Sequence, residues 1–161
     1  METLDLYDSN GKKLNKTILR GQKPNAGEFI KLVVVYLKSR GLFLLQKCSV
    51  EKGGQYAVTG GHVSAGNSSL QQAQIEIQEE LGVKIDSSKL RFLGNINRTN
   101  AIFDVYLYED DSLFDFKFSL QVEEVENVYW LTKAQIEDLI SQGVVRESSC
   151  QHYDKLVKNL K

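Results

Sequence analysis

The segment at positions 60–83, GGHVSAGNSSLQQAQIEIQEELGV, carries the clearest structural signals in this chain. Ser68, followed three residues later by Gln71, forms a capping box, in which each side chain satisfies a free backbone N–H at the start of a helix. Gly82 is the residue type that most often ends a helix in the left-handed conformation. The segment therefore predicts a helix over residues 68–82, entered from a glycine-rich turn.

One side of this predicted helix is apolar. At 100° per residue, Leu70, Ala73, Ile77 and Leu81 fall within an arc of about 80°. An apolar stripe of this kind normally covers the core of a globular protein. We therefore expect these four side chains to face the core.

The acidic residues of the helix lie beside that stripe. The spacing of Glu76, Glu79 and Glu80 is i, i+3, i+4, which makes them neighbours on a helix surface. The helix has no Lys or Arg that would offset the repulsion between their charges. Clustered carboxylate oxygens suit a hard divalent cation, Mg²⁺ or Mn²⁺. The alternative is a solvated acidic face. The Gly60-Gly61 pair before the helix permits close approach of the backbone to a ligand, which favours the metal site.

Outside this segment the chain alternates between strand and helix signals. Strands are expected where β-branched and apolar residues run or alternate, and helices where a cap precedes a 3.6-residue period. The predicted strands are 30–37, 42–46, 56–59, 90–95, 102–108 and 125–131, and the further helices are 132–141 and 148–160. This order predicts an α/β fold with a mixed sheet and helices on its faces.

The N-terminal region has a separate signal. Leu4–Tyr7 alternates between apolar and polar residues and is followed by Asn10-Gly11, a strong hairpin turn. The single proline, Pro24, lies in a glycine-flanked stretch that marks a break. We therefore expect a β-hairpin extension over residues 1–27 and one globular domain over residues 28–161.

Composition restricts the partners. The 161 residues include 20 basic and 21 acidic ones, so a formal charge of −1 gives no general attraction to nucleic acid or to an anionic membrane. The longest apolar run, 32–37, is too short to cross a membrane. The first residues lack the features of a secretory signal, and two cysteines make no disulfide framework. We expect a cytoplasmic protein that binds neither a nucleic acid polymer nor a membrane.

The segment at 60–83 resembles a known motif. The Nudix box reads G-x5-E-x7-R-E-U-x-E-E-x-G-U, where U is aliphatic, and this chain matches it at Gly61 and throughout 76–83. Two positions depart from it, because Asn67 stands where the family has Glu and Ile75 where it has Arg. In members of the family that Glu and that Arg pair with each other. Their joint absence here therefore leaves no uncompensated charge. Restoring both together is expected to raise hydrolysis.

The resemblance implies a Nudix-type α/β/α sandwich. It further implies a hydrolase that cleaves a diphosphate linkage in a nucleoside-diphosphate-X substrate, with Mg²⁺ or Mn²⁺ held by Glu76, Glu79 and Glu80. A weaker similarity extends over most of the chain to the isopentenyl-diphosphate-isomerase-like branch. The departures keep a second hypothesis open, a degenerate Nudix module that binds a nucleotide or a partner with little or no hydrolysis.

Further residues complete the predicted site. Glu79, Glu123 or Glu124 would act as the general base that takes a proton from water. Two roles are considered for His62, a structural role in the loop and that of a metal ligand. Lys47 and Lys52 flank a loop near the box and could neutralise substrate phosphates. The predicted substrate-binding residues are Gly60, Gly61, His62 and Lys47. The partner is a small-molecule diphosphate, and the sequence is compatible with a homodimer.

Overall fold

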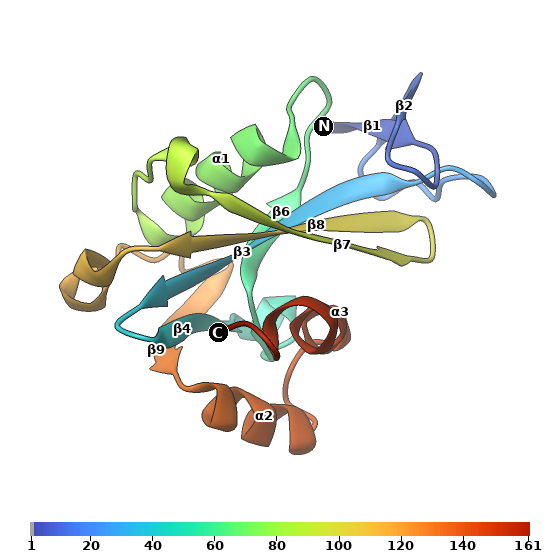
Figure 1. The fold of residues 1–161 in the computed structure, drawn as a ribbon. Helices are drawn as coiled ribbons and strands as arrows, with labels where there is room; N and C mark the ends of the chain where they lie inside the picture. Colours follow the sequence, from blue (N-terminus) through green and yellow to red (C-terminus); the bar gives the residue numbers. More distant parts are fainter. Residues whose placement is uncertain (1) are drawn as a thin grey trace.

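The computed structural model describes residues 2–161 and shows a mixed sheet with helices on both faces (Figure 1). The strands are β1 (Thr3–Tyr7), β2 (Lys13–Leu19), β3 (Ile30–Ser39), β4 (Leu42–Cys48), β5 (Tyr56–Ala57), β6 (Thr59–His62), β7 (Arg91–Arg98), β8 (Ala101–Glu109) and β9 (Val125–Leu131). The helices are α1 (Ser69–Leu81), α2 (Lys133–Ser141) and α3 (Glu147–His152). In this described part of the chain, no helix is long and apolar enough to cross a membrane.

The long strand β3 is the centre of the main sheet. On one edge it pairs in parallel with β8 along its whole length, and β7 pairs antiparallel with β8 beyond it. The other edge is divided, because β6 pairs with residues 32–35 and β4 pairs only with Lys38 and Ser39. The strands β5 and β9 pair with β4. The interrupted edge is where the candidate site lies.

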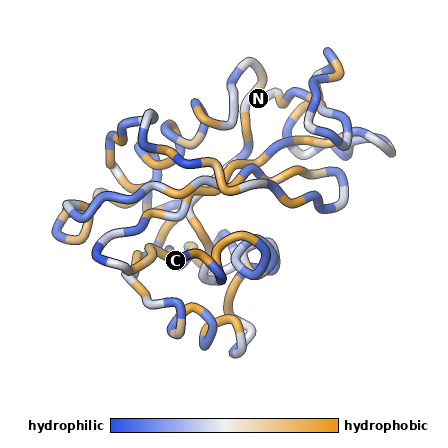
Figure 2. Tube along the Cα trace, viewed as in Figure 1, coloured by the Kyte–Doolittle hydropathy of each residue, from blue (hydrophilic) through white to orange (hydrophobic). Residues whose placement is uncertain are grey.

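The alternation of side chains along β3 divides the core into two layers. Val33, Val35 and Leu37 pack on the side of α1, whereas Val34 and Tyr36 pack on the side of α2 and the C-terminal helix. Successive residues of a strand point to opposite faces, so a strand buried on both faces is apolar at nearly every position. Figure 2 shows the hydrophobic residues along the central strands. The mixed sheet and the α/β/α layers confirm the predicted fold class.

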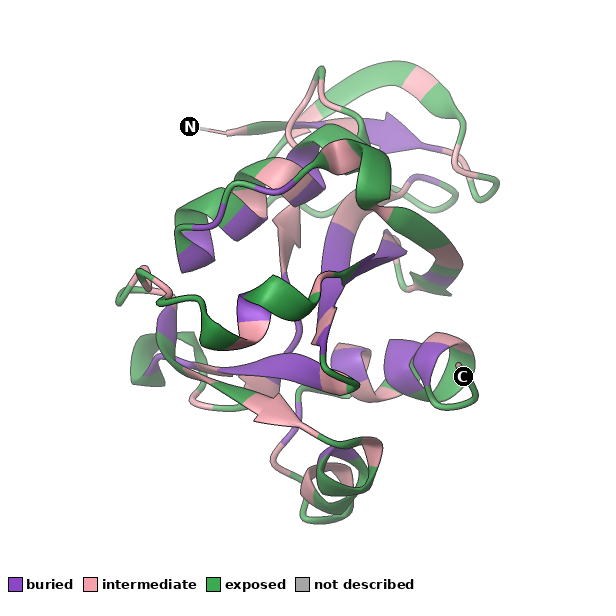
Figure 3. Cartoon of the chain, turned by 60° about the vertical axis from the view of Figure 1, so that its left-hand side comes forward, coloured by how far each residue is buried: buried purple, intermediate pink, exposed green. Residues whose placement is uncertain are grey.

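Helix α1 begins and ends as its sequence predicts. The side chains of Ser68 and Gln71 form the reciprocal capping box, and Gly82 follows the helix with φ of 70°. Ala73, Ile77 and Leu81 are fully buried on one side of the helix, while the opposite side is exposed to solvent (Figure 3). The prediction for Leu70 is wrong, since 37% of its surface is exposed. A helical wheel records direction but not position along the axis, and Leu70 lies in the first turn, outside the core cluster.

The N-terminal hairpin, β1 with β2, forms a two-stranded sheet that is joined to the main domain. Tyr7 and Phe29 exchange backbone hydrogen bonds of 2.8 and 2.9 Å. The N–H of Ala65 donates to the Thr3 carbonyl, and the N–H of Gly66 donates to the Asp5 carboxylate, both at 2.9 Å. These bonds anchor the hairpin to the turn that precedes α1.

Two predicted elements differ from the structure. The stretch 56–59, predicted as one strand, is divided between β5, which pairs with β4, and β6, which pairs with β3. The predicted helix at 148–160 is instead α3 followed by a π-helical turn, Tyr153–Val157. Tyr153 and Val157 are both buried, so the irregular turn is part of the core.

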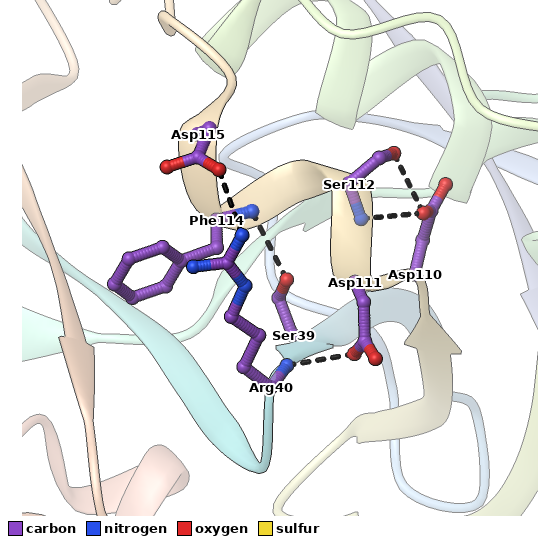
Figure 4. Close-up of polar contacts among 7 residues, drawn as sticks. All are labelled: Ser39, Arg40, Asp110, Asp111, Ser112, Phe114 and Asp115. Atoms are coloured by element: carbon purple, nitrogen blue, oxygen red, sulfur yellow. Dashed lines mark hydrogen bonds and ion pairs between the residues drawn. The ribbon is translucent and has the colours of Figure 1, made fainter.

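The end of β3 that lies away from the candidate site is held by polar contacts (Figure 4). Arg40 follows β3 with φ of 50°, and its N–H donates to the Asp111 carboxylate at 2.8 Å. Its guanidinium donates to Asp115 at 2.8 Å and lies 4.6 Å from the centre of the Phe114 ring. These contacts attach the β3–β4 turn to the short 3₁₀ helix Asp111–Asp115.

Candidate active site

Two adjoining hollows lie where β6 meets the start of α1. One has a volume of about 350 Å³ and is lined mainly by residues of the segment at 60–83, together with Glu2 and Gln121. The other, of about 170 Å³, extends between β3, β4 and the start of α3. The six residues that line both hollows are Arg20, Gly60, Gly61, His62, Glu80 and Glu124. The two spaces therefore form one continuous site.

Two carboxylates of α1 are partly withdrawn from water in this site. Burial raises the pKa of Glu76 to about 7, against the opposing effect of a hydrogen bond from Gln72. Burial also raises the pKa of Glu80 to about 8, and the nearby Glu76 carboxylate adds to the shift. Glu80 is 5% exposed, and its Oε2 atom is buried without a hydrogen-bond partner. A buried carboxylate oxygen without a partner is costly, so this position suits a cation.

Two more of the glutamates predicted for the site also line the larger hollow. Glu79 is exposed to solvent at its rim. The Glu124 carboxylate forms an ion pair with Lys52 at 3.4 Å. Within residues 2–161, no three His, Cys, Asp or Glu side chains stand close enough to form a ready-made metal site. Glu79 and Glu124 would therefore have to rotate toward a cation bound at Glu76 and Glu80.

The two glycines pack too closely for any side chain. A Cβ atom built on Gly60 would overlap the carbonyl oxygen of Val33 on the neighbouring strand. A Cβ atom on Gly61 would come within 2.5 Å of the carboxylate carbon of Glu76. Gly60 thus keeps β6 paired with β3, and Gly61 leaves room for the carboxylate.

The structure brings some of the predicted residues together and leaves others apart. His62 lines both hollows, and burial lowers the pKa of its imidazole, which favours the neutral form. Lys47 lines neither hollow and forms an ion pair with Glu126 at 3.7 Å. Alternation along β4 explains this, because its neighbours Gln46 and Cys48 face the site.

The cations at the site come from three distant segments, and the sequence predicted Lys52 but neither arginine. Arg20 follows the N-terminal hairpin, and Lys52 belongs to the loop after β4. Arg146 precedes α3, and its guanidinium donates to the Cys48 sulfur at 3.3 Å. Gln72 was also missed, although its position four residues before Glu76 places the two side chains side by side on a helix.

Comparison with known proteins relates the chain to one family. No family model matches it. An uncharacterised Nudix hydrolase of Listeria innocua is 36% identical over 150 residues, which cover 89% of this chain and 87% of that protein. A second one, from Listeria monocytogenes, is 34% identical over 149 residues. Nudix hydrolase 3 of Arabidopsis thaliana is 30% identical over 158 residues, a fifth of its length.

Solved structures agree on the fold. The Deinococcus radiodurans protein DR0079 superimposes with a TM-score of 0.80 at 21% identity, over 97% of this chain and 99% of its own. A bifunctional NMN adenylyltransferase/ADP ribose pyrophosphatase from Francisella tularensis, complexed with AMP and a Mn ion, has a TM-score of 0.63 over 86% of this chain and 42% of its own. The fold and the relatives define a pyrophosphatase-type hydrolase, which acts on phosphoanhydride bonds. The chain belongs to the Nudix hydrolase family.

Proposed function

We propose that this site hydrolyses the diphosphate linkage of a nucleoside-diphosphate-X substrate, with Mg²⁺ or Mn²⁺ held by Glu76, Glu79 and Glu80. The observation that supports this most strongly is the buried Glu80 carboxylate, whose Oε2 has no partner and whose neighbour is Glu76. Burial opposes ionisation of both carboxyls, and a divalent cation bound beside them would stabilise their charged form. The structure of the Francisella neighbour with AMP and a Mn ion supports the same pairing of nucleotide and cation.

The chemistry divides between the cation and the chain. A bound divalent ion would polarise a phosphoryl oxygen and lower the pKa of a water molecule. Arg20, Lys52 and Arg146 would neutralise the remaining phosphate charge, since all three line the smaller hollow. Glu124 or Glu79 would accept the proton from the attacking water, because both line the larger hollow. Catalysis would come mainly from positioning and from charge stabilisation.

A panel of substrates tests the proposal. It would contain ADP-ribose, nucleotide sugars, dinucleoside polyphosphates, NADH, CoA and modified nucleoside triphosphates, each assayed for phosphate products with Mg²⁺ and with Mn²⁺. We expect turnover of at least one nucleoside-diphosphate-X compound, and loss of most of it in Glu79→Gln and Glu80→Gln. Turnover that is unchanged in EDTA would contradict a metal-dependent site.

One observation favours a second function. Ile75 lines the larger hollow at the place where the family box has a cationic residue, and 36% of its surface is exposed there. The second candidate is a module that binds a nucleotide without hydrolysing it. Saturable binding of a panel compound, with no phosphate product under either metal, would support this function over the first.

A further inference from the structure

The side-chain amide of Gln72 connects Asn67 to Glu76 within the larger hollow. Gln72 lies on α1 and is 4% exposed. Its Oε1 accepts hydrogen bonds from the Ser64 N–H at 3.1 Å and from Asn67 Nδ2 at 3.0 Å. Its Nε2 donates to Oε1 of Glu76 at 3.0 Å. A chain of hydrogen bonds therefore runs from Asn67 through Gln72 to Glu76.

The contacts determine which way the amide points. A backbone N–H can only donate, so the Gln72 atom that faces Ser64 must be the oxygen. The amide nitrogen then faces Glu76 and can only donate to it. Burial of Gln72 among these partners restricts its rotation. The donor that reaches Glu76 is consequently held in place before any ligand arrives.

Glu76 is confined on its other side by the backbone. The carboxylate lies so close to Gly61 that no Cβ atom would fit between them. Glu76 is thus held between a glycine and an amide donor. The family box would place an arginine at position 75, but Ile75 offers no hydrogen bond, and Asn67 donates to Gln72 where the box would have an acid.

We propose that Gln72, held by Asn67 and Ser64, is the positioning residue that orients Glu76 toward the cation in place of the missing arginine. This inference rests on the proposed function of Glu76 as a metal ligand. A neutral amide satisfies one oxygen of Glu76 and leaves the negative charge of the carboxylate for the cation. Partners that orient metal ligands commonly contribute 10–100-fold to metal affinity.

Mn²⁺ binding to the full-length chain tests the inference without requiring turnover. Free Mn²⁺ would be measured by electron paramagnetic resonance during titration. Gln72→Met keeps the length of the side chain and removes the amide, and we expect the Mn²⁺ dissociation constant to rise about 10-fold. Asn67→Ala should raise it less. Because Asn67 acts through Gln72, the double variant should bind Mn²⁺ no more weakly than Gln72→Met alone.

Gln74→Met is the matched control. Gln74 lies on the same helix, and its Nε2 also donates a 3.0 Å hydrogen bond, but to the Ile85 carbonyl, outside the site. This control should lower the melting temperature while the Mn²⁺ dissociation constant stays within about twofold of wild type. Saturating Mn²⁺ should restore most of kcat in Gln72→Met, as expected for a residue that acts through a ligand.

The outcomes separate the inference from the proposed function. Wild-type affinity in Gln72→Met, equal weakening in Gln74→Met, or additive effects of Gln72→Met and Asn67→Ala would each overturn the role of Gln72. If Gln72→Met fails to fold, unchanged Mn²⁺ affinity in Asn67→Ala would overturn it. Unchanged Mn²⁺ affinity in Glu80→Gln would instead contradict the metal site itself.

Discussion

Glu123 and Glu124 are consecutive in the chain, yet only Glu124 lines the hollow that contains Glu76 and Glu80. The Glu123 side chain is exposed, and its carbonyl oxygen accepts a 2.8 Å hydrogen bond from Ser49. We therefore expect Glu124→Gln to lower kcat by roughly 100-fold if this carboxylate is the general base. Glu123→Gln is the adjacent control and should stay within about twofold of wild type. Equal losses in both variants would argue against a specific role for Glu124.

The two glycines of the site should respond differently to the same substitution. In Gly60→Ala the added methyl group meets a rigid backbone carbonyl, so the free energy of unfolding should fall by about 1–3 kcal/mol. In Gly61→Ala it meets the carboxylate of Glu76, a side-chain end that would shift away from its place beside Gln72 while the backbone stays as it is. The fold should then persist while Mn²⁺ affinity drops by about 10-fold. Thermal unfolding and Mn²⁺ titration of both variants check this contrast.

Metal binding should depend strongly on pH. With pKa values of about 7 for Glu76 and about 8 for Glu80, both carboxyls are largely protonated at pH 6, and a cation must displace those protons. Mn²⁺ affinity should therefore rise from pH 6 and level off above about pH 8. Proton release measured by calorimetry in two buffers checks this expectation. Affinity that does not change over this range would contradict it.

The same shifts set the direction of the pH dependence of stability without metal. The folded-state pKa of Glu80 lies above the ordinary value of 4.5, so the folded protein binds more protons than the unfolded chain between these values. Stability in EDTA should consequently decrease as pH rises from about 4.5 to 8. Glu80→Gln removes this titration and should have a higher melting temperature than wild type at pH 9.

Arg20 extends the site to the N-terminal hairpin. It lines both hollows and is paired with Glu2 at 3.6 Å. We expect Arg20→Gln to raise KM about 5-fold with a smaller change in kcat, since one partly exposed charged contact contributes on the order of 1 kcal/mol. Lys16→Gln is the control, because Lys16 lies in the same hairpin and pairs with Glu28, away from the hollows. An equal change in KM for both variants would exclude a specific contact.

The contacts of Asn67 give a reason to test one expectation drawn from the motif. The box alone predicts that Asn67→Glu with Ile75→Arg raises hydrolysis. A carboxylate at position 67 cannot donate to Gln72 Oε1 and would repel that oxygen, which the Ser64 N–H still holds, so the support of Glu76 by the Gln72 amide would weaken. We now expect the double variant to bind Mn²⁺ more weakly than wild type. Adding Gln72→Ala should recover affinity, because the new arginine would then be the main partner of the carboxylates.

Much of the fold and the acidic half of the site follow from local sequence. The capping box at Ser68 and Gly82 set the limits of α1, and the spacing of Glu76, Glu79 and Glu80 places all three along one hollow. These features depend on residues within a few positions of one another. Helical periodicity and capping are short-range effects, so the sequence by itself determined them.

Only the tertiary structure decided which distant residues lie beside the glutamates of α1 in the site. Glu124, Arg20 and Arg146 reach the hollows because β4 pairs with β9 and the hairpin binds the turn before α1. Lys47 is kept away because a strand alternates its side chains between two faces, and its register depends on pairing with distant strands. Charged side chains on loops carry no periodic signal of their own. Their place in the site depends on packing between elements, and that is settled only when the whole chain folds.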